Sequence, residues 1–286
     1  MKVIVTGANG QLGREIVELA DSTDDEVIGL DSAALDITDR DAVHTAIAEL
    51  RPDVVVNCAA FTAVDACEEQ PERALDVNGH GVRWLAEAVD AVGGHLLQIS
   101  TDYVFDGTLD RPYIETDEPN PRSAYGRTKL VGEREALALG AAGTVVRTSW
   151  VCGYHGSNMV KTVLRLVSEN RPLAFVDDQV GHPTFTGDLA PALLQLARDR
   201  RSGIFHLTNQ GAVSWYEFVR SVVEGLGADP GIVRAIATRD LDPPRPAPRP
   251  ANSVLENRAW SEAGYQPLRD FHEPLTELLA RLHRHP

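Results

Sequence analysis

The chain has 286 residues, a length that suits one large α/β domain or a core that carries an added lobe. Hydrophobic residues make up 43% of it, yet no run approaches eighteen consecutive apolar residues, which excludes a membrane-spanning segment. The formal net charge of −15 argues against sequence-independent binding to nucleic acid or to anionic lipid.

The basic residues are divided unevenly between the two types. Of 27 in total, only Lys2, Lys129 and Lys161 are lysines, and the rest are arginines. An acid-rich, lysine-poor composition resembles that of proteins from salt-loving archaea. A GC-rich genome, which favours arginine codons, produces the same bias. Both explanations stay open, and neither bears on the reaction.

The cysteines and histidines predict neither disulfides nor a metal. Cys58, Cys67 and Cys152 form no C-x-x-C pair, and their odd number cannot close a disulfide framework. The nine histidines make no H-x-x-x-H pair, so we expect no catalytic metal. The first strand begins at once and reaches a glycine turn at Gly7, too soon for a signal peptide, so we expect a cytoplasmic protein.

Strands and helices alternate over the first half of the chain. Apolar runs predict strands, and helical periodicity predicts helices between them. The strands are expected at 3–6, 26–31, 53–57, 95–100 and 144–149, and the helices at 14–20, 39–50, in a long stretch to about 92, and at 124–139. This βαβ order predicts an α/β fold with a Rossmann-type, doubly wound parallel sheet over residues 1–150.

The second half is less regular, and it predicts a smaller C-terminal substrate-binding lobe over residues 151–286. Some of its segments are expected to return to the core. The expected elements are helices at 158–169, 187–199 and from Trp215, strands at 173–176 and 204–207, and two helical stretches that flank Gly264. Proline-rich residues 242–250 are typical of a stiff linker.

A glycine-rich turn follows the first strand and predicts a dinucleotide site. Gly7, Gly10 and Gly13 are spaced for a tight turn, close approach of a pyrophosphate, and packing of helix on strand. Asp31 ends the second strand, where an acid accepts the hydroxyls of an adenine ribose and repels a 2′-phosphate. The sequence therefore predicts NADH or NADPH as the cofactor, with NADH favoured.

Two further loops follow strands whose carboxyl ends should face the same crevice. Asp36 and Ile37 are expected to line the adenine side, and the segment from Asn57 to Ala60 the nicotinamide side. The second segment can also be interpreted more simply, as the end of a strand that happens to be built from small residues.

Tyr125 and Lys129 are four residues apart, on one face of an expected helix. Reduction of a carbonyl needs a proton at oxygen as hydride reaches carbon, and a nearby cation should lower the pKa of a tyrosine that gives this proton. One of only three lysines stands here, where arginine would be a poorer point charge. Thr101, at the end of the preceding strand, is placed to hydrogen-bond the same carbonyl oxygen.

With these motifs in order, the chain resembles the extended short-chain dehydrogenase/reductases, and among them the reductases of nucleotide-linked keto-sugars. The matching segments cover nearly the whole chain; they are residues 7–13, 51–57, 62–65, 100–107, 125–129, 147–151, 178–184, 215–216 and 249–253. The resemblance implies reduction of the C4 ketone of dTDP-4-dehydro-L-rhamnose by NADH or NADPH, giving dTDP-L-rhamnose.

The resemblance also implies roles for individual residues. Those implied to hold the cofactor are Gly7, Gly10, Gln11, Leu12, Gly13, Asp31, Asp36, Ile37, Ala60, Phe61, Thr62, Tyr125 and Lys129. Those implied to contact the substrate are Thr101, Asp102, Trp150, Arg249 and Asn252. Tyr125, Lys129 and Thr101 would carry the catalysis. Some relatives hold Mg²⁺ between two subunits through glutamates; Glu15 matches one such position but Asp188 replaces another, so we expect no metal, and a homodimer at most.

Two other functions remain as alternatives. One is another extended short-chain enzyme, a sugar-nucleotide dehydratase or epimerase. A dehydratase would carry Thr-Asp-Glu where this chain has Thr101-Asp-Tyr103, and an epimerase usually has serine at position 101. The other is a non-catalytic regulatory subunit, because relatives of these reductases bind methionine adenosyltransferase.

Overall fold

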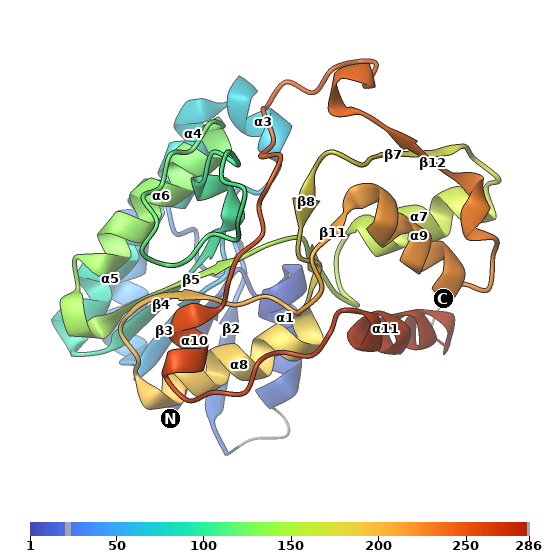
Figure 1. Ribbon diagram of the computed structural model, residues 1–286. Coiled ribbons are helices and arrows are strands. Elements are labelled where there is room, and N and C mark those ends of the chain that lie inside the picture. Colours follow the sequence, from blue (N-terminus) through green and yellow to red (C-terminus); the bar gives the residue numbers. More distant parts are fainter. Residues whose placement is uncertain (21–23, 285–286) are drawn as a thin grey trace.

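A six-stranded parallel sheet forms the centre of the computed structural model, which describes residues 1–20 and 24–284 (Figure 1). All five strand pairs are parallel. In spatial order the strands are β10 (Gly203–His206), β5 (Gly143–Thr148), β4 (His95–Thr101), β3 (Val54–Asn57), β1 (Lys2–Thr6) and β2 (Glu26–Leu30). The expected Rossmann-type fold is confirmed. The order reverses between β1 and β3, which is where such sheets bind ligands.

Helices cover both faces because successive side chains of each strand point to opposite sides. Ile4 and Val55 pack under the helices of one face, and Val3 and Val54 under those of the other. The first face carries α2 (Arg40–Leu50), α5 (Gly81–Val92) and α6 (Ala124–Leu137). The second carries α1 (Gln11–Ala20), α8 (Thr186–Asp199) and α10 (Arg258–Glu262).

The long helical stretch expected before residue 92 is broken into four pieces. They are α3 (Val64–Glu69), α4 (Pro71–Leu75), a π-helical turn over Asp76–His80, and α5. Pro71 starts α4 because a proline at the first helical position needs no hydrogen-bond donor. Periodicity alone did not predict the π-turn, because an extra residue in one turn changes the spacing only locally.

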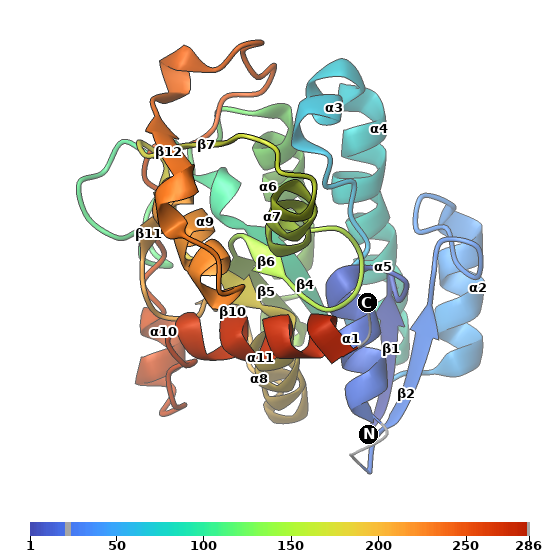
Figure 2. The same cartoon turned by 90° about the vertical axis from the view of Figure 1, so that its right-hand side faces the viewer.

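A smaller lobe packs beside the sheet and has its own apolar core (Figures 1 and 2). Its helices are α7 (Met159–Ser168), α9 (Trp215–Gly225) and α11 (His272–Arg284), and β7 (Leu173–Val176) pairs with β12 (Val233–Ile236). The lobe also contains four two-residue strands, which the sequence did not predict. They form two pairs: β6 (Val151–Cys152) with β9 (Thr184–Phe185), and β8 (Val180–Gly181) with β11 (Val213–Ser214).

Segments from the second half of the chain return to the central sheet. β10 extends the sheet beside β5, while α8 and α10 cover its second face. The proline-rich segment 242–250 is not a free linker, because Ala247 and Arg249 hydrogen-bond to Asp65 of α3. The last two residues of the expected lobe, 285–286, lie outside the described part of the chain.

Short 3-10 turns complete the described elements, and some boundaries differ from expectation. The turns span Asp102–Val104, Gly140–Ala142, Pro230–Ile232 and Thr238–Asp240. Helix α1 begins at Gln11 rather than 14, because the glycine turn is tighter than the apolar pattern indicated. Within the described residues, no helix has the length and apolar character to cross a membrane.

Candidate active site

Two connected cavities lie at the carboxyl ends of β1, β3 and β4. The first has a volume of about 500 Å³ and the second about 550 Å³, and Gly10, Cys58 and Ala60 line both. Of the residues predicted for the site, the first cavity is lined by Gly7, Gly10, Asp31, Asp36, Ile37, Ala60 and Phe61. The second is lined by Gly10, Gln11, Leu12, Gly13, Ala60, Thr62, Thr101, Asp102, Tyr125, Lys129 and Trp150.

Gly7 is required by the turn between β1 and α1. Its φ of +67° is one that a residue with a side chain rarely adopts. A Cβ there would lie 2.6 Å from the backbone nitrogen of Ala59, at the end of β3. The turn therefore lies directly against the neighbouring strand end, and the N-terminus of α1 faces the shared part of the two cavities.

The acid at the end of β2 is held by its own loop. The Asp31 carboxylate accepts hydrogen bonds from Asn9 Nδ2 at 2.5 Å and from the backbone nitrogens of Ala33 and Ala34 at 3.0 and 2.9 Å. Asp36 caps its own loop in the same way, accepting from the backbone nitrogen of Thr38 at 2.9 Å. Both carboxylates are thus fixed at the rim of the first cavity.

Asn78, which sequence analysis missed, fixes the loop after β3. Its Oδ1 accepts from the Phe61 backbone nitrogen at 2.8 Å, and its Nδ2 donates to the Phe61 carbonyl oxygen at 3.1 Å and to Thr128 Oγ1 at 3.2 Å. This fully buried amide therefore ties the Ala60–Thr62 loop to α6. The only signal in the sequence was Asn78-Gly79 inside a helical pattern, an unusual pair for a helix interior.

Helix α6 brings Tyr125 and Lys129 into the second cavity together with Thr101 at the end of β4. Ser123 caps the helix by accepting from the backbone nitrogen of Gly126 at 3.1 Å. A Cβ at Gly126 would lie 2.1 Å from the Tyr103 carbonyl oxygen, so this glycine allows the helix to begin close to the strand end. Lys129 Nζ donates to the carbonyl oxygen of Ile99 at 2.6 Å, which fixes the ammonium against β4.

The expected lowering of the Tyr125 pKa is wrong for this structure. Burial of the phenol raises its pKa, contact with the Thr101 hydroxyl offsets this in part, and Asp102 and Tyr103 raise it further. Burial also lowers the pKa of Lys129 to about 8, against the raising effect of Glu133. Tyr125 is therefore a protonated phenol at neutral pH, which is the form that gives a proton.

Asp102 is a buried acid beside the pair. Burial raises its pKa to about 6, and contacts with the Ser253 and Thr101 hydroxyls lower it. Thr101 Oγ1 donates to Asp102 Oδ1 at 2.9 Å. Ser253, from the segment after the proline-rich stretch, was not predicted individually for the site, although the motif that contains it was singled out.

A tryptophan pair closes the second cavity on the side of the lobe. Trp150, with a φ of +44°, stacks on Trp215 with ring centroids 3.7 Å apart and an interplanar angle of 11°. Both rings line the cavity, and Gly181 behind Trp150 leaves no room for a Cβ. A strained backbone at a cavity wall is typical of functional sites. Trp215 was missed as a site residue because its partner across the chain could not be predicted.

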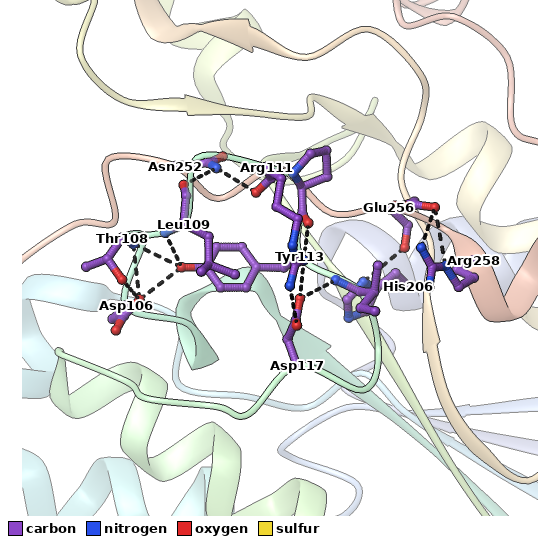
Figure 3. A network of polar contacts seen from close by, with 12 residues as sticks. Asp106, Thr108, Leu109, Arg111, Tyr113, Asp117, His206, Asn252, Glu256 and Arg258 are labelled. Carbon is purple, nitrogen blue, oxygen red and sulfur yellow. Dashed lines mark hydrogen bonds and ion pairs between the residues drawn. The ribbon is translucent and has the colours of Figure 1, made fainter.

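Arg249 and Asn252 do not themselves line either cavity, although Arg249 contacts Tyr103, which lines the second one. Arg249 forms a two-pronged ion pair with Asp65, with nitrogen–oxygen distances of 2.5 and 2.7 Å. Asn252 Nδ2 donates to the carbonyl oxygens of Leu109 and Arg111 at 2.8 and 3.0 Å (Figure 3). These contacts fix the end of the proline-rich stretch to α3 and to the loop at residues 109–111.

The positions considered for a shared metal have basic partners. Glu15 accepts from Arg281 at 3.2 Å, and Asp188 pairs with Arg269 at 2.6 Å. Among the described residues, no group of three or more histidines, cysteines and acids is arranged to hold a metal ion.

Comparison with known proteins gives one family and several similar enzymes. A family model described as RmlD substrate binding domain matches residues 1–284. The chain is 48% identical to a dTDP-4-dehydrorhamnose reductase from Streptomyces griseus over 280 residues, 96% of this chain and 91% of that protein. It is 42% identical to a dTDP-4-keto-6-deoxy-D-glucose reductase from Streptomyces niveus over 275 residues, 96% of this chain and 95% of that protein. The structure of a dTDP-4-dehydrorhamnose reductase from Bacillus anthracis in complex with NADP is similar with a TM-score of 0.94 and 34% identity, and the match covers 98% of this chain and 99% of that one.

Proposed function

Since this chain belongs to the RmlD substrate binding domain family, we propose that it is an NAD(P)H-dependent reductase of a nucleotide-linked keto-sugar. The substrate is the C4 ketone of dTDP-4-dehydro-L-rhamnose, and the product is dTDP-L-rhamnose. The observation that carries the proposal is one cavity lined by Thr101, Tyr125 and Lys129 and joined to the cavity beside the glycine turn.

The residues present fit a dinucleotide. Gly10 lines both cavities without placing a side chain between them, and the N-terminus of α1 at Gln11 offers free N–H groups to a pyrophosphate. Asp31 would accept the ribose hydroxyls, with Asp36 and Ile37 beside the adenine. Ala60, Phe61 and Thr62 would line the nicotinamide, and Lys129 its ribose. When bound, the cofactor supplies the hydride that reaches C4 of the sugar.

The chain's own residues supply the proton and the electrostatics. Tyr125 donates its phenolic proton to the ketone oxygen. Thr101 Oγ1, which donates to Asp102 Oδ1 in this structure, turns its O–H to the ketone oxygen and orients it by a hydrogen bond. The Lys129 ammonium stabilises the negative charge that develops on the Tyr125 oxygen. Asp102 contacts the sugar hydroxyls, and the Trp150 ring excludes water from one side of the hexose.

Arg249 and Asn252 are proposed to approach the nucleotide part of the substrate. The short ion pair with Asp65 means that Arg249 must exchange a carboxylate for a diphosphate oxygen when substrate binds. Both are anionic acceptors that match the guanidinium, so the exchange needs only a local movement.

We also propose a preference for NADH, because Asp31 would repel a 2′-phosphate. We propose salt tolerance from the acid-rich composition. A cytoplasmic location is proposed as well, and a metal-free homodimer from the family resemblance alone. Sedimentation with and without a chelator tests the last of these.

Loss of NADH absorbance tests the proposed activity. Purified protein receives dTDP-4-dehydro-L-rhamnose, generated in situ, with NADH or NADPH at low and at molar salt, and the sugar product is identified. Formation of dTDP-L-rhamnose supports the proposal. Turnover of dTDP-4-keto-6-deoxy-D-glucose alone would favour the activity named for the Streptomyces niveus relative. Folded protein that binds NADH and turns over no keto-sugar would favour the regulatory-subunit alternative.

A further inference from the structure

A buried ion pair joins helix α6 to strand β5, one helical turn beyond Lys129. Glu133 of α6 and Arg147 of β5 each expose only 1% of their surface. Arg147 donates from Nε to Glu133 Oε1 at 2.9 Å and from Nη2 to Oε2 at 2.7 Å. Ser100 Oγ, one residue before Thr101, donates to the same Oε1 at 2.5 Å. The proposed mechanism does not use any of these three groups.

The pair is built into the same helix face as the site. Tyr125, Lys129 and Glu133 follow one another at four-residue spacing, so that the Glu133 carboxylate lies one turn from the Lys129 stem. A buried ion pair is costly to desolvate and seldom adds much stability. Stability alone therefore does not explain why this pair lies beside the site.

The surroundings of Lys129 favour its neutral form. Lys129 is 3% exposed, and its Nζ donates to one carbonyl oxygen, so little in its immediate contacts replaces the water that would solvate an ammonium. Among the described groups, Glu133 raises its pKa and burial lowers it. The Cys58 thiol is the other titratable neighbour, and burial raises its pKa to about 12, so it is neutral when Lys129 titrates.

The other charged groups around α6 have partners of their own. Glu68 of α3 accepts from the Ala124 backbone nitrogen at the helix start, and Asp102 accepts from Thr101. Arg147 is the cation of the pair itself. Glu133 is paired as well, with Arg147 and Ser100, but it is the anion that lies one turn from Lys129 on the same face of α6.

We propose that Glu133, fixed by Arg147 and Ser100, is a positioning residue that keeps Lys129 a cation at the pH where the enzyme works. Ser100 couples the carboxylate to the strand that carries Thr101, and Arg147 couples it to β5. The expected effect on turnover rests on the proposed function. The charge state of Lys129 does not, because it can be measured without substrate.

The chain offers an unusually clear test because it has only three lysines. Protein labelled with carbon-13 at lysine Cε gives one signal each for Lys2, Lys129 and Lys161, and Lys129→Arg assigns the site. Glu133→Gln removes the charge at nearly constant shape. The pKa of Lys129 should fall by on the order of one to two pH units in this variant. The alkaline limb of kcat/KM against pH should move down by a similar amount.

Two further variants serve as controls, one for the loss of a charge on α6 and one for a failure to fold. Glu135→Gln makes the same charge change on the same helix two residues later, and it should leave both measurements unchanged. If Glu133→Gln does not fold because Arg147 is left unpaired, Glu133→Met/Arg147→Leu removes both charges and should shift Lys129 in the same direction by less.

An unchanged Lys129 titration in the folded Glu133 variants would overturn the inference. That result is independent of the proposed function. If wild-type protein turns over no keto-sugar, the proposed function fails while the titration still decides the role of Glu133.

Discussion

Gly7→Ala is the substitution whose cost follows most directly from the geometry. An L-residue at a φ of +67° costs about 1–2 kcal/mol. The added methyl group would lie 2.6 and 2.7 Å from the backbone nitrogen and Cα of Ala59 and 2.8 Å from the carbonyl carbon of Cys58. These are backbone atoms of the loop that directly follows β3 and cannot rotate away as a side chain could, so overpacking adds about 1–3 kcal/mol. The free energy of unfolding should fall by about 2–5 kcal/mol.

The same clash should weaken cofactor binding, because relief moves the turn that presents N–H groups to the pyrophosphate. Loss of one charge-assisted hydrogen bond costs about 1.5–3 kcal/mol, which corresponds to roughly 10- to 100-fold in the Kd for NADH. Thermal unfolding should show Tm lowered by roughly 4–10 °C, and fluorescence titration with NADH should show the weaker Kd.

Gly93→Ala is the matched control. Gly93 has a φ of +71°, but nothing lies within 4 Å of where its Cβ would be. This variant should lose only the conformational part of the stability, about 1–2 kcal/mol, and keep the wild-type Kd. If Gly7→Ala were as mild as Gly93→Ala and bound NADH equally well, the assignment of the turn as the phosphate site would be refuted.

Three other changes have distinct expected outcomes. Asp31→Ala should raise affinity for NADPH relative to NADH, since a fixed anion at the ribose site is removed; an unchanged ratio of Kd values would contradict that role. Gly126→Ala should lower kcat more than it weakens NADH binding. The added Cβ would lie 2.1 Å from the Tyr103 carbonyl oxygen, so the start of the helix, which carries Tyr125, must move. Equal effects on kcat and on NADH binding would argue against this role of Gly126. Burial lowers the pKa of His182 to about 4, so the unfolded chain takes up a proton below about pH 6.5 that the folded chain does not. Stability should therefore fall between pH 6.5 and 4 by on the order of 3 kcal/mol, and denaturant midpoints of His182→Gln should show a smaller slope with pH.

The central sheet and the main site were predictable because their signals are local. Apolar runs such as Val54–Asn57 and the spacing of Gly7, Gly10 and Gly13 depend on a few neighbouring residues. The four-residue spacing of Tyr125 and Lys129 similarly indicated a shared helix face. Two cavities at the carboxyl strand ends agree with the expected placement of the cofactor and sugar sites.

Features that depend on distant partners were not predictable. The direction of the Tyr125 pKa was wrong because burial and the neighbouring Asp102 raise it, and both are set by the whole fold. Asn78-Gly79 was unusual for a helix interior, but the role of Asn78 became visible only with the loop at Phe61 placed beside it. Glu133 belongs to no motif that the sequence analysis singled out. Its proposed role depends on contacts with Arg147 of β5 and Ser100 of β4, which only the fold brings beside it.

Transfer of deuterium tests the central claim most directly. Protein is mixed in a single turnover with NADH deuterated at nicotinamide C4 and with dTDP-4-dehydro-L-rhamnose, and the sugar is examined by NMR. We expect deuterium at C4 of dTDP-L-rhamnose with wild-type protein, and a rate lowered about 100-fold or more in Tyr125→Phe with NADH binding retained. Transfer at the wild-type rate in Tyr125→Phe, or bound NADH with no transfer at all, would contradict it.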